Sequence, residues 1–215
     1  MELHDLQIDS FDPGAMDETV QGASFSHVLL ATGRFRAKLL SASAGDQRLD
    51  YGSYNLPVHA RGGMPESHVT LGFVLTNRET TSLNGFRLDG PALVVLREGA
   101  SLDYRLAPGT EWLSFQVTAD SLERLGIDPS ELPAIPISHH IPRCGHLRGE
   151  LKAAVAALQA LESDQPKIIA PNNFGNKIFA GVMDGFHAAL QGSDSAGGRV
   201  PRYRAADYRL LSQAT

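Results

Sequence analysis

The pattern of apolar and polar positions changes character near residue 118. Over residues 34–117 the chain consists of short segments in which apolar and polar residues alternate, with turn residues about every 8–12 positions. In the clearest segment, Val69, Leu71, Phe73 and Leu75 alternate with mainly polar or small residues. A period of two places every second side chain on one face of a strand. The pattern therefore predicts a series of β-strands, each with one apolar face.

Turn residues mark where these strands begin and end. Asn84-Gly85 lies inside Ser82–Leu88, and these two residue types best tolerate the positive φ that a type I′ turn requires, so a hairpin is predicted there. Ala92–Leu96 is a continuous apolar run that fits a strand buried on both faces. Further strands are predicted at Arg34–Ala44, Gln47–Asn55, Ser101–Leu106 and Glu111–Val117. Such short strands, joined by hairpins and uninterrupted by helical segments, favour a double-sheet jelly roll or small β-barrel over a parallel α/β fold.

Helical spacing follows the strands. Asp120, with Glu123 three residues later, predicts the N-cap and capping box of a short helix that ends at Leu125. A longer helix is predicted from the apolar stripe Leu147, Leu151, Ala154, Val155, Leu158 and Leu161. A second long helix is predicted from Pro171 to Gly192, and its stripe comprises Phe174, Ile178, Val182, Phe186 and Leu190. The predicted fold class is mainly β with C-terminal helices, a jelly roll or β-barrel followed by an antiparallel helix pair.

The last part of the chain has the composition of a linker and the start of another helix. Ser193–Arg202 is rich in Gly and Ser, and Ala205, Tyr208 and Leu211 then follow helical spacing. A helix that starts there and ends at once cannot bury its apolar side within its own segment. We therefore expect a further domain after residue 215.

Composition and charge narrow the class of protein. Of the 215 residues, 42% are hydrophobic and 20% are charged, which is typical of a soluble globular protein. The formal net charge of −5 argues against DNA binding by these residues, because DNA binding depends on Lys and Arg neutralising phosphates. Cys144 is the single cysteine, so no internal disulfide can form, and this fits a reducing cytosol. With neither a signal peptide nor an apolar run of about 20 residues, we expect a cytoplasmic protein with no membrane partner.

These features, in this order, resemble the AraC/XylS family of transcription regulators. The resemblance lies in Gly33-Arg-Phe-Arg-Ala-Lys-Leu, the Asn84-Gly85 hairpin, Trp112-Leu-Ser-Phe-Gln-Val with the following Ala-Asp-Ser-Leu-Glu-Arg-Leu, and the tail Tyr203-Arg-Ala-Ala-Asp-Tyr-Arg-Leu-Leu. It implies a cupin-like sensing barrel over residues 1–135, whose first ~20 residues form an arm. It further implies a helical dimerisation segment at 136–192, then a linker and the start of a missing helix-turn-helix domain at 193–215. DNA binding would belong to that absent domain, and the chain would be a homodimer that binds an unidentified small-molecule effector.

Two sets of residues are candidates for these roles. Small β-barrels can hold one small ligand inside, so inward-facing aromatic and polar residues are expected to line the pocket. The candidate pocket residues are Phe35, Tyr51, Tyr54, His68, Phe73 and Trp112. The candidate dimer-interface residues are Phe174, Ile178, Gly181, Val182, Gly185 and Phe186. Each set has an alternative interpretation as packing within one chain.

Metal and catalytic chemistry have weaker support in the sequence. His59, Glu66 and His68 come nearest to the metal ligands of a cupin, but they lack a His-X-His pair. The cluster of His139, His140, Cys144 and His146 has suitable ligand types for zinc without a recognised spacing. No hydrolase, metalloprotease, phosphate-loop or dinucleotide motif is found, so we predict no enzyme activity, no cofactor and no metal. A stand-alone metal-dependent cupin enzyme and a dimerisation module with a filled barrel stay open as alternatives.

Overall fold

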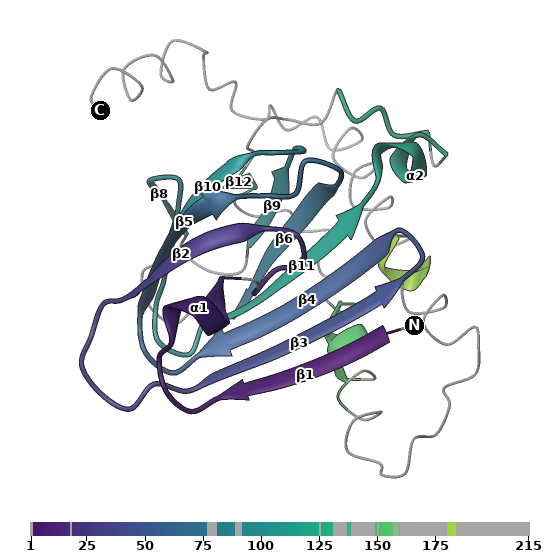
Figure 1. Ribbon diagram of the computed structural model, residues 1–215. Helices are drawn as coiled ribbons and strands as arrows, with labels where there is room; N and C mark the ends of the chain where they lie inside the picture. Colours follow the sequence, from purple (N-terminus) through teal and green to yellow (C-terminus); the bar gives the residue numbers. More distant parts are fainter. Residues whose placement is uncertain are drawn as a thin grey trace, which may run out of the picture.

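Two antiparallel β-sheets that face each other form the body of the molecule (Figure 1). The computed structural model describes residues 2–17, 19–76, 81–88, 92–124, 126–130, 137–138, 149, 151–156, 159 and 180–183. The chain is mainly β, and its two sheets are consistent with the predicted jelly roll. None of the helices within the described ranges has the length and apolarity that a membrane crossing requires.

The larger sheet has seven strands in the order β1-β3-β4-β11-β6-β9-β12. Their bounds are β1 Glu2–Ile8, β3 Ala37–Ala44, β4 Gln47–Tyr54, β11 Glu111–Val117, β6 Val69–Thr76, β9 Ala92–Leu96 and β12 Ile137–Ser138. The smaller sheet has five strands in the order β2-β5-β10-β7-β8. Their bounds are β2 Ser24–Leu29, β5 Val58–Gly63, β10 Ser101–Leu106, β7 Thr81–Leu83 and β8 Phe86–Leu88. Two short helices complete the elements, α1 Pro13–Met16 and α2 Ala119–Glu123.

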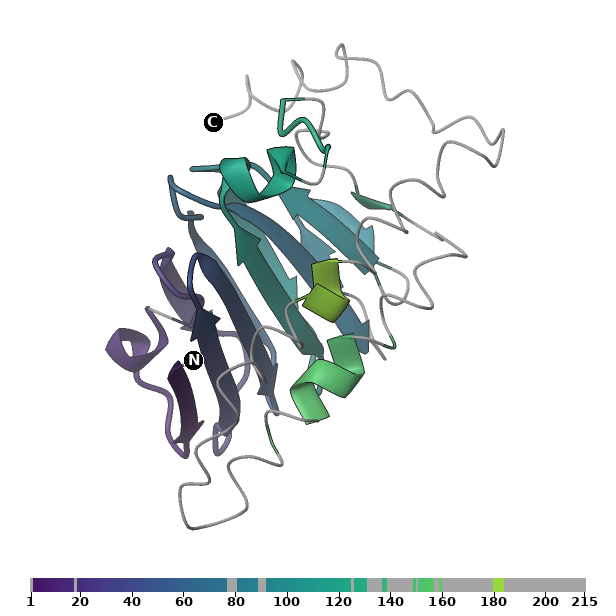
Figure 2. The same ribbon diagram turned by 90° about the vertical axis from the view of Figure 1, so that its right-hand side faces the viewer.

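The larger sheet is buried on both faces. Its inner face packs against the smaller sheet, and Trp112 of β11 and Val74 of β6 belong to this inner core. Its outer face carries a second core, to which Leu113 of β11 contributes. Figure 2 shows the described helical residues 151–156 and 180–183 beside this outer face. Double burial explains β9, in which all five residues are buried as its continuous apolar run predicts.

The hairpin predicted at Asn84-Gly85 is confirmed. Asn84 and Gly85 have φ values of 47° and 79°, in the region that a type I′ turn requires. The Asn84 side chain fixes the turn to the neighbouring strand, because its Oδ1 accepts a hydrogen bond from the amide of Asp103 at 2.6 Å. The strands on either side, β7 and β8, are three residues each and pair directly with one another.

The N-terminal residues differ from the predicted arm. β1 forms the edge of the larger sheet and pairs with β3 along its whole length, from Glu2 opposite Ser43 to Ile8 opposite Ala37. Residues 13–16 then form α1, and Met16 is fully buried in the inner core. An edge strand is held by backbone hydrogen bonds to a single neighbour. Because these bonds require no particular side chains, the strand has no clear apolar–polar alternation in the sequence.

Two other elements also differ from the predictions. α2 is capped by Thr118, whose Oγ1 accepts from the amide of Ser121 at 3.4 Å, and Asp120 lies in the first turn instead of at the cap. In the predicted first long helix, residues 151–156 are helical, with Leu151, Ala154 and Val155 buried against the outer core. The rest of that helix, most of the second one, and the linker and tail lie outside the described residues.

Candidate ligand-binding cavity

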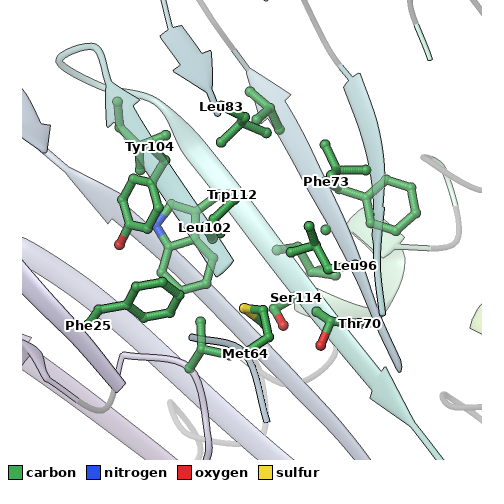
Figure 3. A pocket seen from close by; sticks show the side chains of 16 residues that line it. Phe25, Met64, Thr70, Phe73, Leu83, Leu96, Leu102, Tyr104, Trp112 and Ser114 are labelled. Atoms are coloured by element: carbon green, nitrogen blue, oxygen red, sulfur yellow. The ribbon is translucent and has the colours of Figure 1, made fainter. Parts of the chain in front are cut away.

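A cavity of about 70 Å³ lies between the two sheets, in the inner core (Figure 3). Both sheets contribute to its walls, the larger through β6, β9 and β11 and the smaller through β2, β7 and β10. The lining residues are Val20, Phe25, Met64, Thr70, Gly72, Phe73, Val74, Leu83, Val94, Leu96, Leu102, Tyr104, Leu106, Trp112, Leu113 and Ser114. None of them carries a formal charge, so the cavity is suited to an uncharged and mainly apolar molecule.

Trp112 fixes one wall of the cavity. Its register partner on β4 is Gly52, and a Cβ atom at that position would overlap the indole ring. Glycine therefore allows the indole to lie directly against the β4 backbone. The ring of Tyr54 lies next to it, with 6.3 Å between centroids. Trp112 is also the only tryptophan in the chain, so its fluorescence reports on this wall alone.

A buried histidine–tyrosine pair lies on the side of the smaller sheet. His27 Nε2 and the hydroxyl of Tyr104 are 2.7 Å apart in a hydrogen bond, and Phe25 packs on Tyr104 with 5.5 Å between ring centroids. Burial lowers the pKa of His27 from 6.5 to about 4, because the imidazolium would lose its hydration. Burial also raises the pKa of Tyr104 well above its ordinary value. Both groups are therefore neutral at physiological pH.

Polar residues lie behind one end of the cavity. Asp50 is fully buried and accepts hydrogen bonds from the hydroxyl of Ser41, from the backbone and side chain of Gln21, and from Gln116 Nε2 at 3.3 Å. Burial is the largest influence on the pKa of Asp50 and raises it, whereas the bonds from Ser41 and Gln21 act in the opposite direction. Next to this network, Ser114 of β11 lies opposite Asp50 in register and lines the cavity.

Two of the six predicted pocket residues, Phe73 and Trp112, contribute to the cavity wall, but the side chain of Phe73 belongs to the outer core, on the other face of the larger sheet from Trp112. Phe35 and Tyr54 are buried in the inner core without lining it. Tyr51 belongs to the outer core, with its hydroxyl 3.4 Å from Glu111 Oε1. His68 immediately precedes β6, and its ring contacts Ser67 Oγ at 2.8 Å and the backbone oxygen of Asp46 at 3.2 Å.

Of the six predicted dimer-interface residues, the structure describes two, Gly181 and Val182. Phe174, Ile178, Gly185 and Phe186 lie outside the described residues. Gly181 is half-buried. Val182 is buried in the outer core of its own chain.

The histidines considered for a metal site have other partners. His59 Nε2 lies 2.9 Å from Asp103 Oδ1, and Asp103 also pairs with Arg61. Within the part of the chain that the structure describes, no group of three or more His, Cys, Asp or Glu residues could hold a metal ion. The cluster formed by His139, His140, Cys144 and His146 lies outside the described residues.

Several cavity residues were missed by the sequence analysis. Phe25 belongs to β2, a strand that was not predicted, whereas Tyr104 follows an alternation that was noted and could have been found from it. Thr70 and Ser114 occupy the polar positions of their strands, which the alternation rule assigns to solvent. They line the cavity because the larger sheet has a core on each face.

Comparisons with known proteins gave similarities to solved structures only. No protein-family model matches the chain, and no curated protein matches it. The crystal structure of the AraC-like transcriptional activator CuxR is similar over 87% of this chain and 70% of that one, with 11% identity and a TM-score of 0.49. The Cnp3 cupin domain of Schizosaccharomyces pombe is similar over 62% of this chain and 95% of that one, with 13% identity and a TM-score of 0.23.

Gly72 offers a way to reduce the cavity without disturbing its walls. A Cβ atom there would lie 3.7 Å from the backbone oxygen of Val94, which is an ordinary contact. Gly72→Ala is expected to stabilise the fold by about 0.5–1 kcal/mol, because alanine loses less backbone entropy on folding. Gly52→Ala is the contrasting variant and should destabilise the fold, because it displaces Trp112. Urea unfolding measures the free energy of unfolding of both variants, which should rise for Gly72→Ala and fall for Gly52→Ala. Equal changes in the two variants would contradict the described packing.

Proposed function

We propose that this chain is the effector-sensing part of an AraC-type transcription regulator, and that the effector binds between the two sheets. The observation that carries the sensing role is the uncharged cavity, whose walls come from both sheets. A ligand there contacts both halves of the sandwich at once. The regulatory role is supported by the resemblance of the sequence to the AraC/XylS family, in which a DNA-binding domain follows the sensing part.

Binding would act on DNA only through that further domain. An effector shifts the balance between two arrangements of a regulator only if it binds them with different affinity. The cavity is separated from the outer core by the larger sheet alone, and the helical residues 151–156 pack on that outer face. A change in the position of β6 or β11 would therefore move the surface on which these helical residues pack. We propose that these helices also join two subunits.

Fluorescence of Trp112 and thermal unfolding together test the sensing role. A panel of small uncharged molecules is added to the protein, and a ligand is expected to shift the emission of Trp112 and to raise the melting temperature. At a concentration of 100 times its Kd a ligand adds about 2.7 kcal/mol to stability, which corresponds to roughly 5–10 °C. The proposal fails if no compound in a broad panel changes either signal.

Gly72→Val provides the control, because it places an isopropyl group in the cavity on a strand that favours β-branched residues. A true cavity ligand should lose both effects with this variant. If the variant responds as the unchanged protein does, the compound binds elsewhere, and the effect gives no support to a sensing cavity.

A further inference from the structure

The strand β2 forms one edge of the smaller sheet, so only its side toward β5 is paired with another strand among the described residues. The amide of Leu30, just after β2, continues this pairing, because it donates to the carbonyl of Pro57 at 3.0 Å. The amide of Phe25 points to the opposite side, where it donates to the carbonyl of Asp17 at 3.3 Å, next to α1 (Figure 1). Successive residues of a strand direct their backbone groups to opposite sides, so every second residue after Phe25 also faces away from β5.

His27 and Leu29 are the residues of β2 that face this open side beyond Phe25. Each directs one amide and one carbonyl there, and the structure describes no strand on that side to bind them. Val28, between them, projects from the outer surface of the sheet and is 54% exposed, and Leu30 is 46% exposed on the same surface. This part of β2 therefore combines backbone hydrogen-bonding groups with exposed apolar side chains.

The other three edges of the two described sheets have protections that β2 lacks. Natural sheets avoid pairing with other chains by placing charged residues on an edge strand or by keeping that strand very short. The sequence of β1 includes Glu2 and Asp5, β8 has three residues and includes Arg87, and β12 has two described residues. In contrast, residues 19–33 contain no Asp, Glu, Lys or Arg. Among these edges, β2 is therefore the one suited to pairing with a further strand.

The open part of β2 is complementary to a second copy of itself. When two β2 strands lie antiparallel with a twofold axis at Val28, His27 of each copy lies opposite Leu29 of the other. Each copy contributes two amides and two carbonyls, which together make four hydrogen bonds between the copies. The two Val28 side chains then face each other in the closer, non-hydrogen-bonded type of pair. A shifted register would instead bring in Phe25, whose amide already has a partner, or Ala31, which lies beyond the strand.

We infer that β2 is an interface at which two copies of this chain pair edge to edge, so that their smaller sheets join into one antiparallel sheet. A second copy is favoured as the partner because this register uses every backbone group on the open side of His27 and Leu29, as a twofold contact between identical strands requires. The formal net charge of −5 lies outside residues 19–33, so the strands meet where neither chain has a formal charge. The contact involves few residues, so weak association is expected. It is separate from the contact between helices proposed above.

Two variants of opposite charge test this contact, because Val28 meets its own copy across the axis. Val28→Lys and Val28→Glu each place like charges opposite one another, so each variant should associate at least about tenfold more weakly than the unchanged protein. A mixture of the two variants places opposite charges together and should associate again. Analytical ultracentrifugation of the full chain, from micromolar to millimolar concentration, measures each case.

Leu6→Lys is the matched control. Leu6 is 48% exposed on β1, the edge strand of the other sheet, so this variant adds the same charge in a similar setting. Its association should equal that of the unchanged protein. Because Val28 and Leu6 are both exposed, all three variants should keep the melting temperature of the unchanged protein in dilute solution.

Hydrogen exchange of the backbone amides locates the contact on β2. In the unchanged protein the amides of His27 and Leu29 should exchange more slowly as the concentration rises, and Val28→Lys should abolish this protection. The inference is overturned if these amides exchange without protection at every concentration, if mixing the two charge variants restores no association, or if Leu6→Lys weakens association as much as Val28→Lys does. An assembly whose size and exchange do not change in Val28→Lys is held by another contact, such as the proposed helical one, and also overturns the inference.

Discussion

Replacing Gly62 by alanine should destabilise the protein more than any other single-methyl change in the smaller sheet. A Cβ atom at this position would overlap the backbone carbonyl oxygen of Ser24 and lie 2.7 Å from Cδ1 of Phe25. Backbone atoms cannot yield as the end of a flexible side chain can, so β2 would have to move away from β5. We expect a loss of about 3–5 kcal/mol in the free energy of unfolding, which is typical of overpacking combined with lost strand pairing.

Gly63→Ala is the matched control for this prediction. It is the neighbouring residue on the same strand, its added Cβ would meet nothing within 4 Å, and it pairs with the same two strands. Its free energy of unfolding should stay within about 0.5 kcal/mol of the unchanged protein. Urea unfolding of both variants at one pH makes the comparison, and a similar loss for the two would show that β2 does not lie against Gly62 as described.

Acid should weaken the fold through His27. The pKa of this buried imidazole is about 4 in the folded protein, against 6.5 in its ordinary environment. The unfolded chain therefore binds more protons between these values, and stability that is present above pH 6.5 is lost as the pH falls through 4. The expected loss from this residue is roughly 3 kcal/mol. Protonation would also prevent His27 from accepting a hydrogen bond from Tyr104.

His27→Gln isolates this contribution, because glutamine keeps a hydrogen-bonding group near Tyr104 without titrating. The free energy of unfolding is measured for both proteins between pH 7 and pH 4. Asp50 acts in the opposite direction, since its raised pKa stabilises the fold as the pH falls, but it is common to both proteins and cancels in the difference. Parallel pH profiles for the two proteins would mean that His27 is not desolvated in the folded state.

The size of the cavity bears on how an effector enters. Its volume of about 70 Å³ accommodates only a small molecule as the side chains stand. Met64 and Leu102 are the wall residues with the most freedom to move, because methionine has several rotatable bonds and Leu102 is only partly buried. A larger effector would have to displace these two side chains. Because Leu102 belongs to β10, binding would then be coupled to a movement of β10 against the larger sheet.

Alternation and turn chemistry predicted most strands of both sheets. β4, β9, β10 and β11 lie within a residue of the predicted bounds, because each is delimited by a turn dipeptide or has a clear apolar pattern. Four strands were missed: β1 and β12 at the two edges of the larger sheet, and β2 and β5 in the smaller sheet, which lack such patterns. In β5 the buried residues Val58 and Ala60 alternate with polar ones, but the strand ends in Gly62-Gly63, and Gly62 has no side chain because β2 lies directly against it. The need for glycine at position 62 therefore arises only from the pairing of β5 with β2, which the local sequence does not show.

The residues around the cavity also divide into those that the sequence predicted and those that it did not. The burial of Trp112 and Phe73 was expected from their size, since large aromatic side chains are rarely left in solvent on a strand, but only the Trp112 side chain lies in the inner core with the cavity. Thr70 and Ser114 could not be found in this way, because an alternating strand with one apolar face predicts that its polar positions face water. Their burial depends on a second layer covering that face, which is a long-range contact that no local pattern records.

The sequence by itself determined a mainly β chain, the order of most of its strands, the Asn84-Gly85 turn and the apolar stripe that includes Leu151 and Val155. These depend on local backbone preference and on the period of the side chains, which are properties of neighbouring residues. The tertiary structure alone decided that the larger sheet has a core on each face, that the N-terminal residues form an edge strand, and that the polar residues Thr70 and Ser114 are buried. Each of these depends on contacts between segments far apart in the chain. Whether a residue is buried depends on what packs against it in the folded protein, and not on its type alone.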